Sequence, residues 1–559
     1  MSSQCQVDTS GGSDRSEFNL RCLMGIIRHA DRTCKQKISL KFTGLPPEGL
    51  AVNEDIRSME LLDRLKLVIL SRKSECLSEA YMLVNAVRLM ESNREDVKAK
   101  IELSELGWTA KLKWGGNLTP LGLSQSESAG RHLRLDLHDI LDVGSLDARF
   151  FASTDTRCQE TARSFASAFL RSESVSVRSD DGPDGLGNLD DTPFRHSPLV
   201  KSMRTEVSHL LMSGRKIDSD FKAELFNFPC NGLEALNSLG SSHGTFALAV
   251  SELKSLIDAL IKQLSSIHVD GPLYASESLD LIKSRWGCIH KALHRSDVLQ
   301  ATPRSKWKTQ QTSSGVWLTS LQVSLIGDIY DNCQYDYRHN LELFPSDTVR
   351  LTLTQIRTLV SKLVAIVIPL EYGISGNDKA FIGSTFLHPL LRKLRFDFRL
   401  AANLPLNGEE EFLSKQEEAV AVPGAPARVR LYFAHHSHVY SFVSILESAE
   451  SIFAKTNLSI DLEKLRHIRA YGYLCELLIG VSKHRFSEAW RMTIHVFPGD
   501  AFEDRSGQLT FDQIPIVTAE ALSASDIDDI FTAILAIPAR NGNVPSHLKL
   551  APIGESEDG

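Results

Sequence analysis

The sequence has no hydrophobic run long enough to cross a bilayer, because the longest apolar stretch near its middle, Leu363–Leu370, is short and contains Pro369. The N-terminus, rich in Ser, Gln, Asp and Gly, lacks the apolar core of a secretory signal. The nine cysteines form no CxxC pair and show no metal-ligand spacing, which favours reduced thiols. The chain also lacks a basic excess, since its net charge is −8. We therefore expect a cytoplasmic (cytosolic) protein with no membrane span and no nucleic-acid partner.

An acidic chain must meet an anionic ligand in a local basic pocket, and the sequence holds several basic clusters. The first lies within residues 28–41 and contains a single acid, Asp31; its members are Arg28, Arg32, Lys35, Lys37 and Lys41. The other clusters are Lys111 with Lys113, and Arg392, Lys393, Arg395 and Arg399. A run of this kind is typical of a solvated face. The first cluster differs because it surrounds a histidine.

The arrangement of periodic segments predicts an α/β fold with a central mixed sheet flanked by helices. Residues 18–170 and 428–510 alternate short apolar strands with helices and form two parts of one core. Between them, 171–427 is predicted to be a large, mainly helical cap insertion, with helices such as Phe246–Leu264 and Ser278–Leu293. We expect a disordered tail over 1–17 and a C-terminal extension with an acidic tail over 511–559.

The most informative segment is Arg28-His29-Ala30-Asp31-Arg32-Thr33, which follows the apolar run Leu23–Ile27. That run predicts a buried strand, so the segment leaves the sheet at the carboxyl end of a strand, where α/β folds bind ligands. A guanidinium group can bind phosphoryl oxygens through two parallel hydrogen bonds, and an imidazole can attack phosphorus. The segment therefore favours phosphoryl chemistry, while a buried strand end followed by surface charges remains the alternative.

A second strand end carries another arginine. The strand Arg149–Ser153 is followed by a helix that Thr154 or Asp155 can cap, and Arg157 lies in its first turn. Free backbone N–H groups and the positive end of the helix dipole make this position a natural anion site. An ordinary surface arginine at a helix start is the alternative.

A third strand, Val429–Ala434, is followed by His435-His436-Ser437-His438 and the apolar helix Val439–Leu446. Ser437 is the expected helix cap, which places His438 at the strand-to-helix junction. On an extended backbone His436 and His438 share a face and His435 points away. Three histidines also allow a metal site, but no carboxylate or cysteine lies nearby at ligand spacing, so we expect neither a metal nor another cofactor.

Together these three strand ends resemble the histidine phosphatase superfamily, in its acid-phosphatase branch. The first motif most closely resembles a narrower group, the phosphatase domain of the bifunctional diphosphoinositol polyphosphate kinase/phosphatases. Four further segments fit that group: Lys113–Gln125, with Thr119 and Pro120 as helix cap and first helical residue; Asp328–Asn340; Ile366–Ile374; and Leu431–Val439. The resemblance covers roughly 20–500 and is blurred around 175–300. It implies a histidine-phosphatase core.

The resemblance implies specific roles for the candidate residues. His29 is the expected nucleophile, forming a phosphohistidine, and Arg28, Arg32, Arg157 and His438 hold the transferring phosphoryl group. Lys35, Lys37 and Lys41 are the expected substrate-binding residues. The implied substrate is an inositol pyrophosphate with a diphosphate at the 1-position, which loses its β-phosphate.

The sequence departs from the family pattern at Cys34, His435 and His436, and it has Val439 where acid phosphatases have a proton-donating aspartate. Phosphate departs far more readily than an alkoxide without a proton donor, because its second pKa is about 6. The absent acid therefore favours cleavage of a phosphoanhydride over a monoester. His436 is the expected substitute donor.

Three other interpretations remain. A kinase activity belongs to the bifunctional family, but the sequence shows no Walker A pattern and no room for an ATP-grasp domain before residue 18, so we expect none. Substitutions at Cys34, His435 and His436 also allow a catalytically weak module that binds inositol pyrophosphates. A metal-dependent protein built on the histidine triplet is the third. The oligomeric state does not follow from the sequence.

Overall fold

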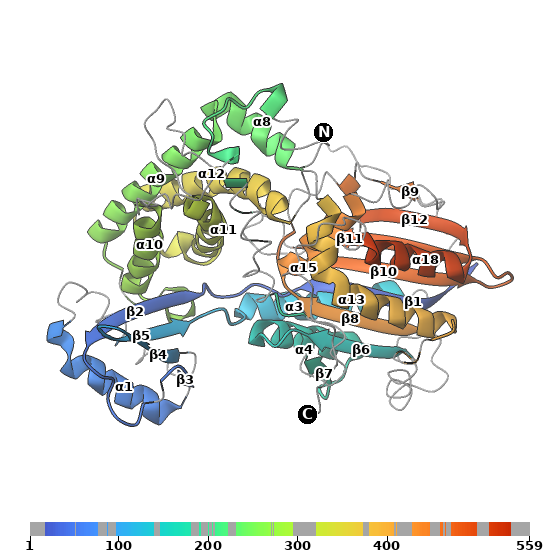
Figure 1. Ribbon diagram of the computed structural model, residues 1–559, viewed down its shortest axis with the longest axis horizontal. Coiled ribbons are helices and arrows are strands. Elements are labelled where there is room, and N and C mark those ends of the chain that lie inside the picture. Colours follow the sequence, from blue (N-terminus) through green and yellow to red (C-terminus); the bar gives the residue numbers. More distant parts are fainter. Residues whose placement is uncertain are drawn as a thin grey trace.

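The computed structural model contains two sheets and a helical part (Figure 1). It describes residues 17–50, 52–56, 58–75, 87, 97–138, 146–179, 189–191, 200, 204, 207–208, 210–221, 231–269, 271, 273–294, 320–372, 379–406, 408, 410, 427–447, 459–461, 464–465, 471–499 and 514–537. The predicted N-terminal tail therefore lies almost wholly outside the described residues, as does the acidic end of the C-terminal extension.

The larger sheet has eight strands in the order β7-β6-β8-β1-β10-β11-β12-β9. These are β1 (Phe18–Arg28), β6 (Asp147–Ala152), β7 (Val177–Ser179), β8 (Arg428–Ala434), β9 (Ser459–Ile460), β10 (Glu476–His484), β11 (Trp490–Phe497) and β12 (Ile514–Leu522). β1 pairs in parallel with β8 and antiparallel with β10, so it lies where the parallel and antiparallel halves meet. The sheet is mixed, as predicted.

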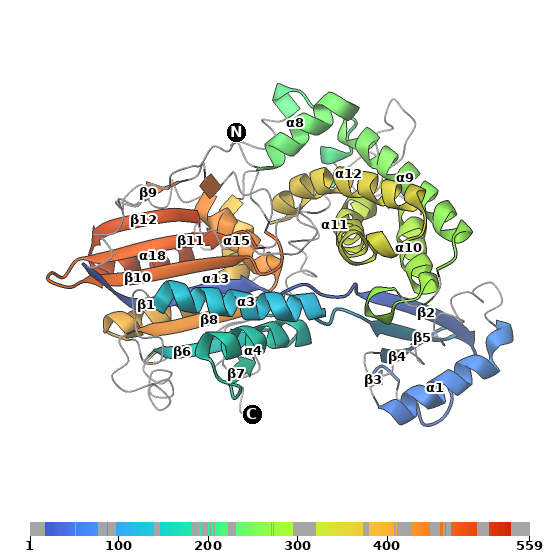
Figure 2. The same ribbon diagram turned by 180° about the vertical axis from the view of Figure 1, so that it is seen from behind.

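Helices cover both faces of this sheet, which explains why β1 is apolar on both sides. Met24 and Ile26 pack with α13 (Lys379–Ala402), α15 (His436–Glu447) and α18 (Ala524–Leu535). Leu23 and Ile27 pack on the opposite face with α3 (Pro120–His138) and α4 (Thr156–Leu170). A strand buried on both faces reads as a continuous apolar run rather than an alternating one. Figure 2 shows α3 and α4 on the face that is hidden in Figure 1.

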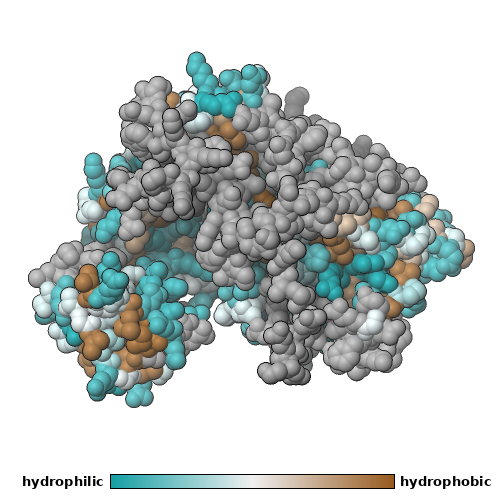
Figure 3. Space-filling view, viewed as in Figure 1, coloured by the Kyte–Doolittle hydropathy of each residue, from teal (hydrophilic) through white to brown (hydrophobic). Residues whose placement is uncertain are grey.

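The smaller sheet has the order β2-β5-β4-β3 and lies beside the helical part (Figure 1). Its strands are β2 (Gln36–Thr43), β3 (Asp55–Ile56), β4 (Lys98–Ser104) and β5 (Gly107–Trp114). One face packs on α1 (Met59–Ser71). The outer side of α1 exposes Met59, Leu67 and Leu70, and brown side chains appear over this region at the lower left of Figure 3.

The helical part has its own core, separate from those on the sheets. Its elements are α8 (Asn231–His243), α9 (Phe246–Ser266), η4 (Tyr274–Ser276), α10 (Leu279–His294), α11 (Ser320–Tyr335), the π-helical η5 (Asp336–Asn340), η6 (Leu341–Leu343) and α12 (Asp347–Glu371). By length and composition α12 is the one helix in the described ranges that could cross a membrane. Many of its apolar side chains pack inside this helical core.

The observed division differs from the predicted one at three places. β7 and α13 fall within the predicted 171–427 insertion but lie on the larger sheet. The small sheet falls within the predicted first part of the core but forms a separate layer. β12 falls within the predicted C-terminal extension but pairs with β11. Sequence periodicity identifies elements but not which sheet they join.

Candidate active site

Three parallel strands end side by side, and the candidate residues follow directly from these ends. The backbone N–H of His29, after β1, donates to the carbonyl of Ala434 at the end of β8 at 3.1 Å. The N–H of Ser153, after β6, donates to the carbonyl of Phe433 at 3.1 Å. The carboxyl ends of β6, β8 and β1 therefore form one edge, the usual ligand-binding edge of an α/β sheet.

His29 is a buried, neutral imidazole whose proton position is fixed by a neighbouring carbonyl. Its Nδ1 lies 2.9 Å from the carbonyl oxygen of Ala30, which can only accept a hydrogen bond. Nδ1 therefore carries the proton, and the lone pair is on Nε2. Burial lowers the pKa of His29 well below 6.5, and the charges of Arg157 and Arg28 lower it further. The side chain is thus held in the form that can act as a nucleophile.

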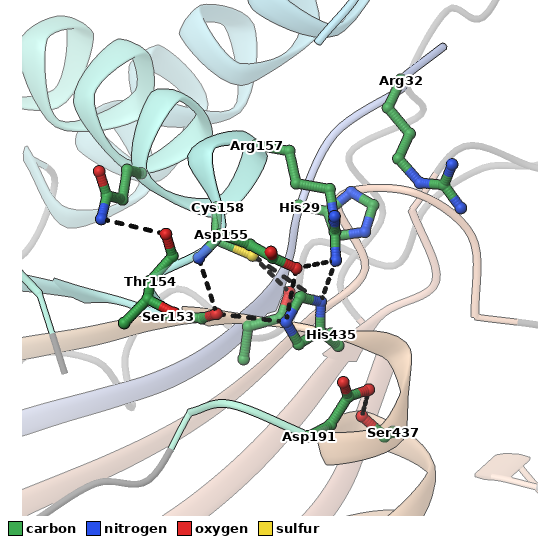
Figure 4. A network of polar contacts seen from close by, with 12 residues as sticks. His29, Arg32, Ser153, Thr154, Asp155, Arg157, Cys158, Asp191, His435 and Ser437 are labelled. Carbon is green, nitrogen blue, oxygen red and sulfur yellow. Dashed lines mark hydrogen bonds and ion pairs between the residues drawn. The ribbon is translucent and has the colours of Figure 1, made fainter. Parts of the chain in front are cut away.

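Three arginines surround His29 (Figure 4 shows Arg32 and Arg157). Arg28 donates to the carbonyl of Tyr471 at 2.7 Å and lies 4.5 Å over the ring of Tyr473, which is also beside His29. Arg157 is in the first turn of α4, as predicted. The Nε atoms of Arg28, Arg32 and Arg157 are buried without a hydrogen-bond partner among the described residues. Buried donors normally have acceptors, so this arrangement is typical of an anion site.

His435 directly contacts this cluster, although an extended backbone predicts that it points away from the face of His436 and His438. Its Nδ1 lies 3.2 Å from Nη2 of Arg157, and since a guanidinium only donates, Nδ1 accepts. Its Nε2 lies 3.2 Å from the hydroxyl of Ser153 and 3.5 Å from the carboxylate of Asp155, which also pairs with Arg157. The ring centroids of His435 and His29 are 5.8 Å apart.

The expected extended conformation over 435–438 is wrong. α15 begins at His436, and the N–H of His438 donates to the carbonyl of His435 at 3.1 Å, so the cap position belongs to His435 rather than Ser437. Residues two apart on a helix do not share a face. His436 accordingly lies 3.3 Å from the hydroxyl of Tyr372, while His438 is buried with its ring 4.6 Å from that of Phe386.

Ser437 serves a different purpose, because its hydroxyl donates to the carboxylate of Asp191 at 2.8 Å. The ring centroid of His438 lies 6.3 Å from that of His435. The next residue, Val439, is fully buried in the core. The triplet is thus divided among three environments, and His435 is the member that contacts Arg157.

The segment from Asp331 to His339 belongs to the helical part and contacts the loop that follows β1. Arg32 donates to Asp331 at 2.8 Å, across 299 residues of sequence. Arg338 donates to the buried carboxylate of Asp31 at 2.9 Å, and His339 lies 2.8 Å from its other oxygen. Burial alone raises the pKa of Asp31, but the hydrogen bond from His339 and the charge of Arg338 outweigh it and lower this pKa overall. These contacts give the Asp328–Asn340 segment a physical role that its sequence does not reveal.

The start of α3 supports the loop that follows His29. Thr119 caps this helix by accepting a hydrogen bond from the N–H of Gly122 at 3.0 Å, and Pro120 is its first residue, as predicted. Thr119 also donates to the carboxylate of Asp31 at 2.5 Å. A Cβ at Gly122 would lie 2.2 Å from the carbonyl oxygen of Asp31. Only glycine allows the helix to approach the loop this closely.

The predicted substrate-binding lysines are all exposed. Lys35 precedes β2, and Lys37 and Lys41 lie on the outer face of β2, which runs away from the strand ends (Figure 1). Lys41 is four residues beyond Lys37, a rise of about 13 Å. Lys37 pairs in register with Lys113 of β5, and burial together with the charges of Lys111 and Lys113 lowers its pKa. The structure therefore does not bring these lysines into contact with His29.

Two clefts flank the cluster. One, of about 360 Å³, lies between α11, α12 and the sheet, and Arg28, Tyr372 and His436 are among its lining residues. The other, of about 470 Å³, is lined by residues that include Asn117, at the loop before α3, and Thr156, next to Arg157.

Cys158 also faces His435, but burial raises its pKa to about 12, so it is a thiol and a poor nucleophile at neutral pH.

The model of the histidine phosphatase superfamily (branch 2) matches residues 19–201 and 293–476. The chain belongs to this superfamily. The matched residues include His29, Arg157 and His435, which meet at the strand ends. The fold is that of a histidine-phosphatase core with a large, mainly helical insertion.

Curated relatives agree with the narrower resemblance. The chain is 27% identical over 507 residues to the rat protein named inositol hexakisphosphate and diphosphoinositol-pentakisphosphate kinase 1, covering 78% of this chain and 33% of that protein. It is 26% identical over 571 residues to human kinase 2 of the same name, covering 88% of this chain and 42% of that protein. The chain thus spans about a third to two fifths of the length of these two relatives.

Among solved structures, the phytase of Klebsiella sp. ASR1 is 11% identical, with a TM-score of 0.38 and coverage of 94% of this chain and 96% of that chain. The Hafnia alvei phytase in complex with myo-inositol hexakis sulphate is 10% identical, with a TM-score of 0.37 and coverage of 92% and 97%.

Proposed function

We propose that this chain is a phosphohydrolase that removes the β-phosphate of diphosphoinositol polyphosphates through a phosphohistidine intermediate on His29. The observation that carries this proposal is the convergence of three guanidiniums, each with a buried Nε, on a neutral imidazole at the strand ends. The superfamily match, and relatives named as inositol hexakisphosphate and diphosphoinositol-pentakisphosphate kinases, support the substrate class. By the same resemblance we assign the reaction to the 1-position.

In the proposed first step, Nε2 of His29 attacks the β-phosphorus, and the bond from that phosphorus to the bridging oxygen breaks. The inositol polyphosphate leaves with its α-phosphate intact. Arg28, Arg32 and Arg157 balance the charge on the transferring oxygens, which is the main contribution that a protein makes to phosphoryl transfer. Water then attacks the phosphohistidine, releasing inorganic phosphate and restoring Nε2.

The proposal favours an anhydride because the position after His438 offers no acid. Val439 is fully buried and apolar. An α-phosphate needs no strong proton donor to leave, whereas an alkoxide does. His436 is our proposed donor for any residual monoester cleavage, because it lines the cleft that Arg28 also lines.

The test is phosphate release from 1-diphosphoinositol pentakisphosphate, inositol hexakisphosphate and an aryl phosphate under identical conditions, each measured with and without EDTA. We expect release from the first at a rate at least a hundredfold above that from the second. Comparable hydrolysis of both inositol compounds would overturn the preference for an anhydride, and activity lost in EDTA would favour a metal-dependent reaction. The His436→Ala variant should lose monoester activity selectively; an equal rise in KM for all substrates would limit His436 to binding anions.

A further inference from the structure

The loop from Tyr471 to Cys475, just before β10, crosses the strand ends in a strained conformation. Leu474 is fully buried and has a φ of 55°, in the left-handed region that leucine rarely adopts. Its N–H donates to the carbonyl of His29 at 3.4 Å, and the N–H of Arg28 donates to the carbonyl of Cys475 at 3.0 Å. Backbone strain of this kind persists only where the surroundings enforce it, and it is concentrated at functional sites.

The chain just after β11 holds this loop in place from the other side. The N–H of Gly472 donates to the carbonyl of Pro498 at 2.9 Å. Gly499 has a φ of 80°, and a Cβ on it would lie 2.3 Å from the carbonyl oxygen of Tyr473. Only glycine allows two backbones to approach this closely. The loop is therefore fixed between β11 and the end of β1, with Leu474 directed into the core and Tyr473 beside His29.

The side chain of Tyr473 lies among the charged residues that follow β1. The guanidinium carbon of Arg28 is 4.5 Å from the centroid of its ring, and that centroid is 5.6 Å from the ring centroid of His29. Burial raises the pKa of Tyr473 although the charges of Arg32 and Arg28 oppose this, so the phenol is neutral at physiological pH. Arg28 also donates to the carbonyl of Tyr471 at 2.7 Å. One loop thus holds Arg28 by both a carbonyl and a ring.

We propose that Tyr473 is a positioning residue, whose ring face holds the guanidinium of Arg28 beside His29 in the orientation that the phosphoryl transfer requires. The inference rests on the proposed function for the identity of the substrate. Arginine has a long, flexible side chain, and a cation–π contact away from water restricts it before the substrate binds. Donors that are already in place stabilise developing charge without reorganising during the reaction. The contact should therefore act mainly on the transition state.

A role in packing alone explains these observations less well. The residue of the loop that fills the core is Leu474, which is fully buried, whereas Tyr473 keeps part of its surface exposed beside the cluster. The left-handed turn at Leu474 is unfavourable by itself, and it brings the ring of Tyr473 against a charged group rather than against apolar neighbours.

The test combines steady-state kinetics on 1-diphosphoinositol pentakisphosphate with binding of orthovanadate and of inorganic phosphate to the full chain. Orthovanadate becomes five-coordinate on a nucleophile and mimics the transition state, whereas inorganic phosphate mimics a ground state. Tyr473→Leu should lower kcat and weaken orthovanadate binding by about thirtyfold, the equivalent of a desolvated cation–π contact, while KM and phosphate binding change by less than about threefold. Tyr473→Phe keeps the ring and should stay within about fivefold of wild type in every measurement.

Fluorinated phenylalanines at position 473 test the ring face at nearly constant shape, and they decide the question if the leucine variant does not fold. Fluorine withdraws negative charge from the ring face, so kcat should fall stepwise from Tyr473→Phe to its mono-, di- and trifluorinated forms. The matched control is Phe18→Leu, which removes the ring 4.2 Å from the guanidinium of Arg491, at the opposite end of β1. It should keep wild-type kinetics and orthovanadate affinity.

The inference is overturned if folded Tyr473→Leu keeps both kcat and orthovanadate affinity within about threefold of wild type, since a cation–π contact that positions Arg28 must affect both. It is also overturned if Tyr473→Phe loses as much activity as Tyr473→Leu, or if fluorination has no effect. Failure of the proposed substrate is recognised separately. The wild type would then release no phosphate from the diphosphate, but orthovanadate affinity would still rank the variants in the expected order.

Discussion

The guanidinium of Arg157 donates a hydrogen bond to His435, with 3.2 Å between Nη2 and Nδ1. The contact joins the first turn of α4 to the end of β8 and orients both side chains beside His29. Arg157 also pairs with Asp155. A change at His435 therefore acts on one of the three arginines that the proposed mechanism requires.

Replacing His435 should impair turnover more than replacing His438. His435→Gln loses a group in contact with Arg157, and we expect a loss on the order of 2–4 kcal/mol in transition-state stabilisation, as for Arg157→Ala. His438→Gln should cost less, because its ring packs on Phe386. Steady-state kinetics of the three variants, with thermal unfolding as the control for folding, would check this order. A larger loss of turnover in His438→Gln than in His435→Gln would indicate that His438, rather than His435, contacts the transferring phosphoryl group.

His29→Ala should reduce phosphate release to below one per cent of wild type without unfolding the chain. The variant removes the imidazole whose Nε2 is the proposed nucleophile, and Arg28, Arg32 and Arg157 all lie near that imidazole. Rapid quenching in base should trap a labelled phosphoenzyme in wild type but not in the variant, and acid should destroy the label. Retention of several per cent of wild-type turnover excludes His29 as the nucleophile.

The imidazole of His29 should remain neutral as the pH falls through 6.5. Burial and the neighbouring arginines depress its pKa, so protonation in the folded protein requires a lower pH than in the unfolded chain. Ring nitrogen-15 NMR at pH 6 should show a neutral ring protonated at Nδ1, assigned by its absence from His29→Ala. Arg157→Ala removes one nearby charge, so the pKa should rise. Imidazolium shifts at pH 6 in the wild type would contradict the prediction.

Glu476→Gln should stabilise the protein in a pH-dependent way. Glu476 is buried opposite Ile27, and burial raises its pKa from 4.5 to about 8. Between these values the unfolded carboxyl is ionised and the folded one is protonated, so the cost to stability grows as pH rises from 4.5 and levels off above 8. At pH 7 we expect the variant to gain about 3 kcal/mol at most, and nothing at pH 4.

Denaturant unfolding of wild type and Glu476→Gln at pH 4, 5.5, 7 and 8.5 measures this dependence. A difference that stays constant over that range would show that packing, rather than ionisation, governs the effect.

Asp31→Asn should loosen the attachment of the helical part to the strand ends. The variant leaves Arg338 without its carboxylate, and removing one partner of a buried ion pair costs on the order of 3–5 kcal/mol. Asp331→Asn is the matched control, since Asp331 is 36% exposed and its pair with Arg32 should contribute about 1 kcal/mol or less. Unfolding by denaturant distinguishes the two. Equal losses would mean that burial of Asp31 does not govern its contribution.

The sequence predicts the strand ends well but not how their side chains meet. Apolar runs and the cap at Thr119 correctly place β1, β6, β8, α3 and α4. The error at His435 arises because the chain enters α15 immediately after β8, so the side-chain period changes from 2 to 3.6 within the triplet. No local pattern marks that boundary. The pairing of Asp31 with His339 spans 308 residues, and no sequence periodicity carries such information.

The central position of β1 has a consequence for how the molecule is made. Its neighbours β8 and β10 come late in the chain, and Arg28 binds the carbonyl of Tyr471, 443 residues further on. During synthesis β1 therefore emerges long before either partner, and its edges stay unpaired until residues 428–484 have left the ribosome. Such long-range pairing is slow and exposes apolar surface meanwhile. We expect nascent chains that stop before residue 428 to depend on chaperones and to assemble none of the strand-end cluster.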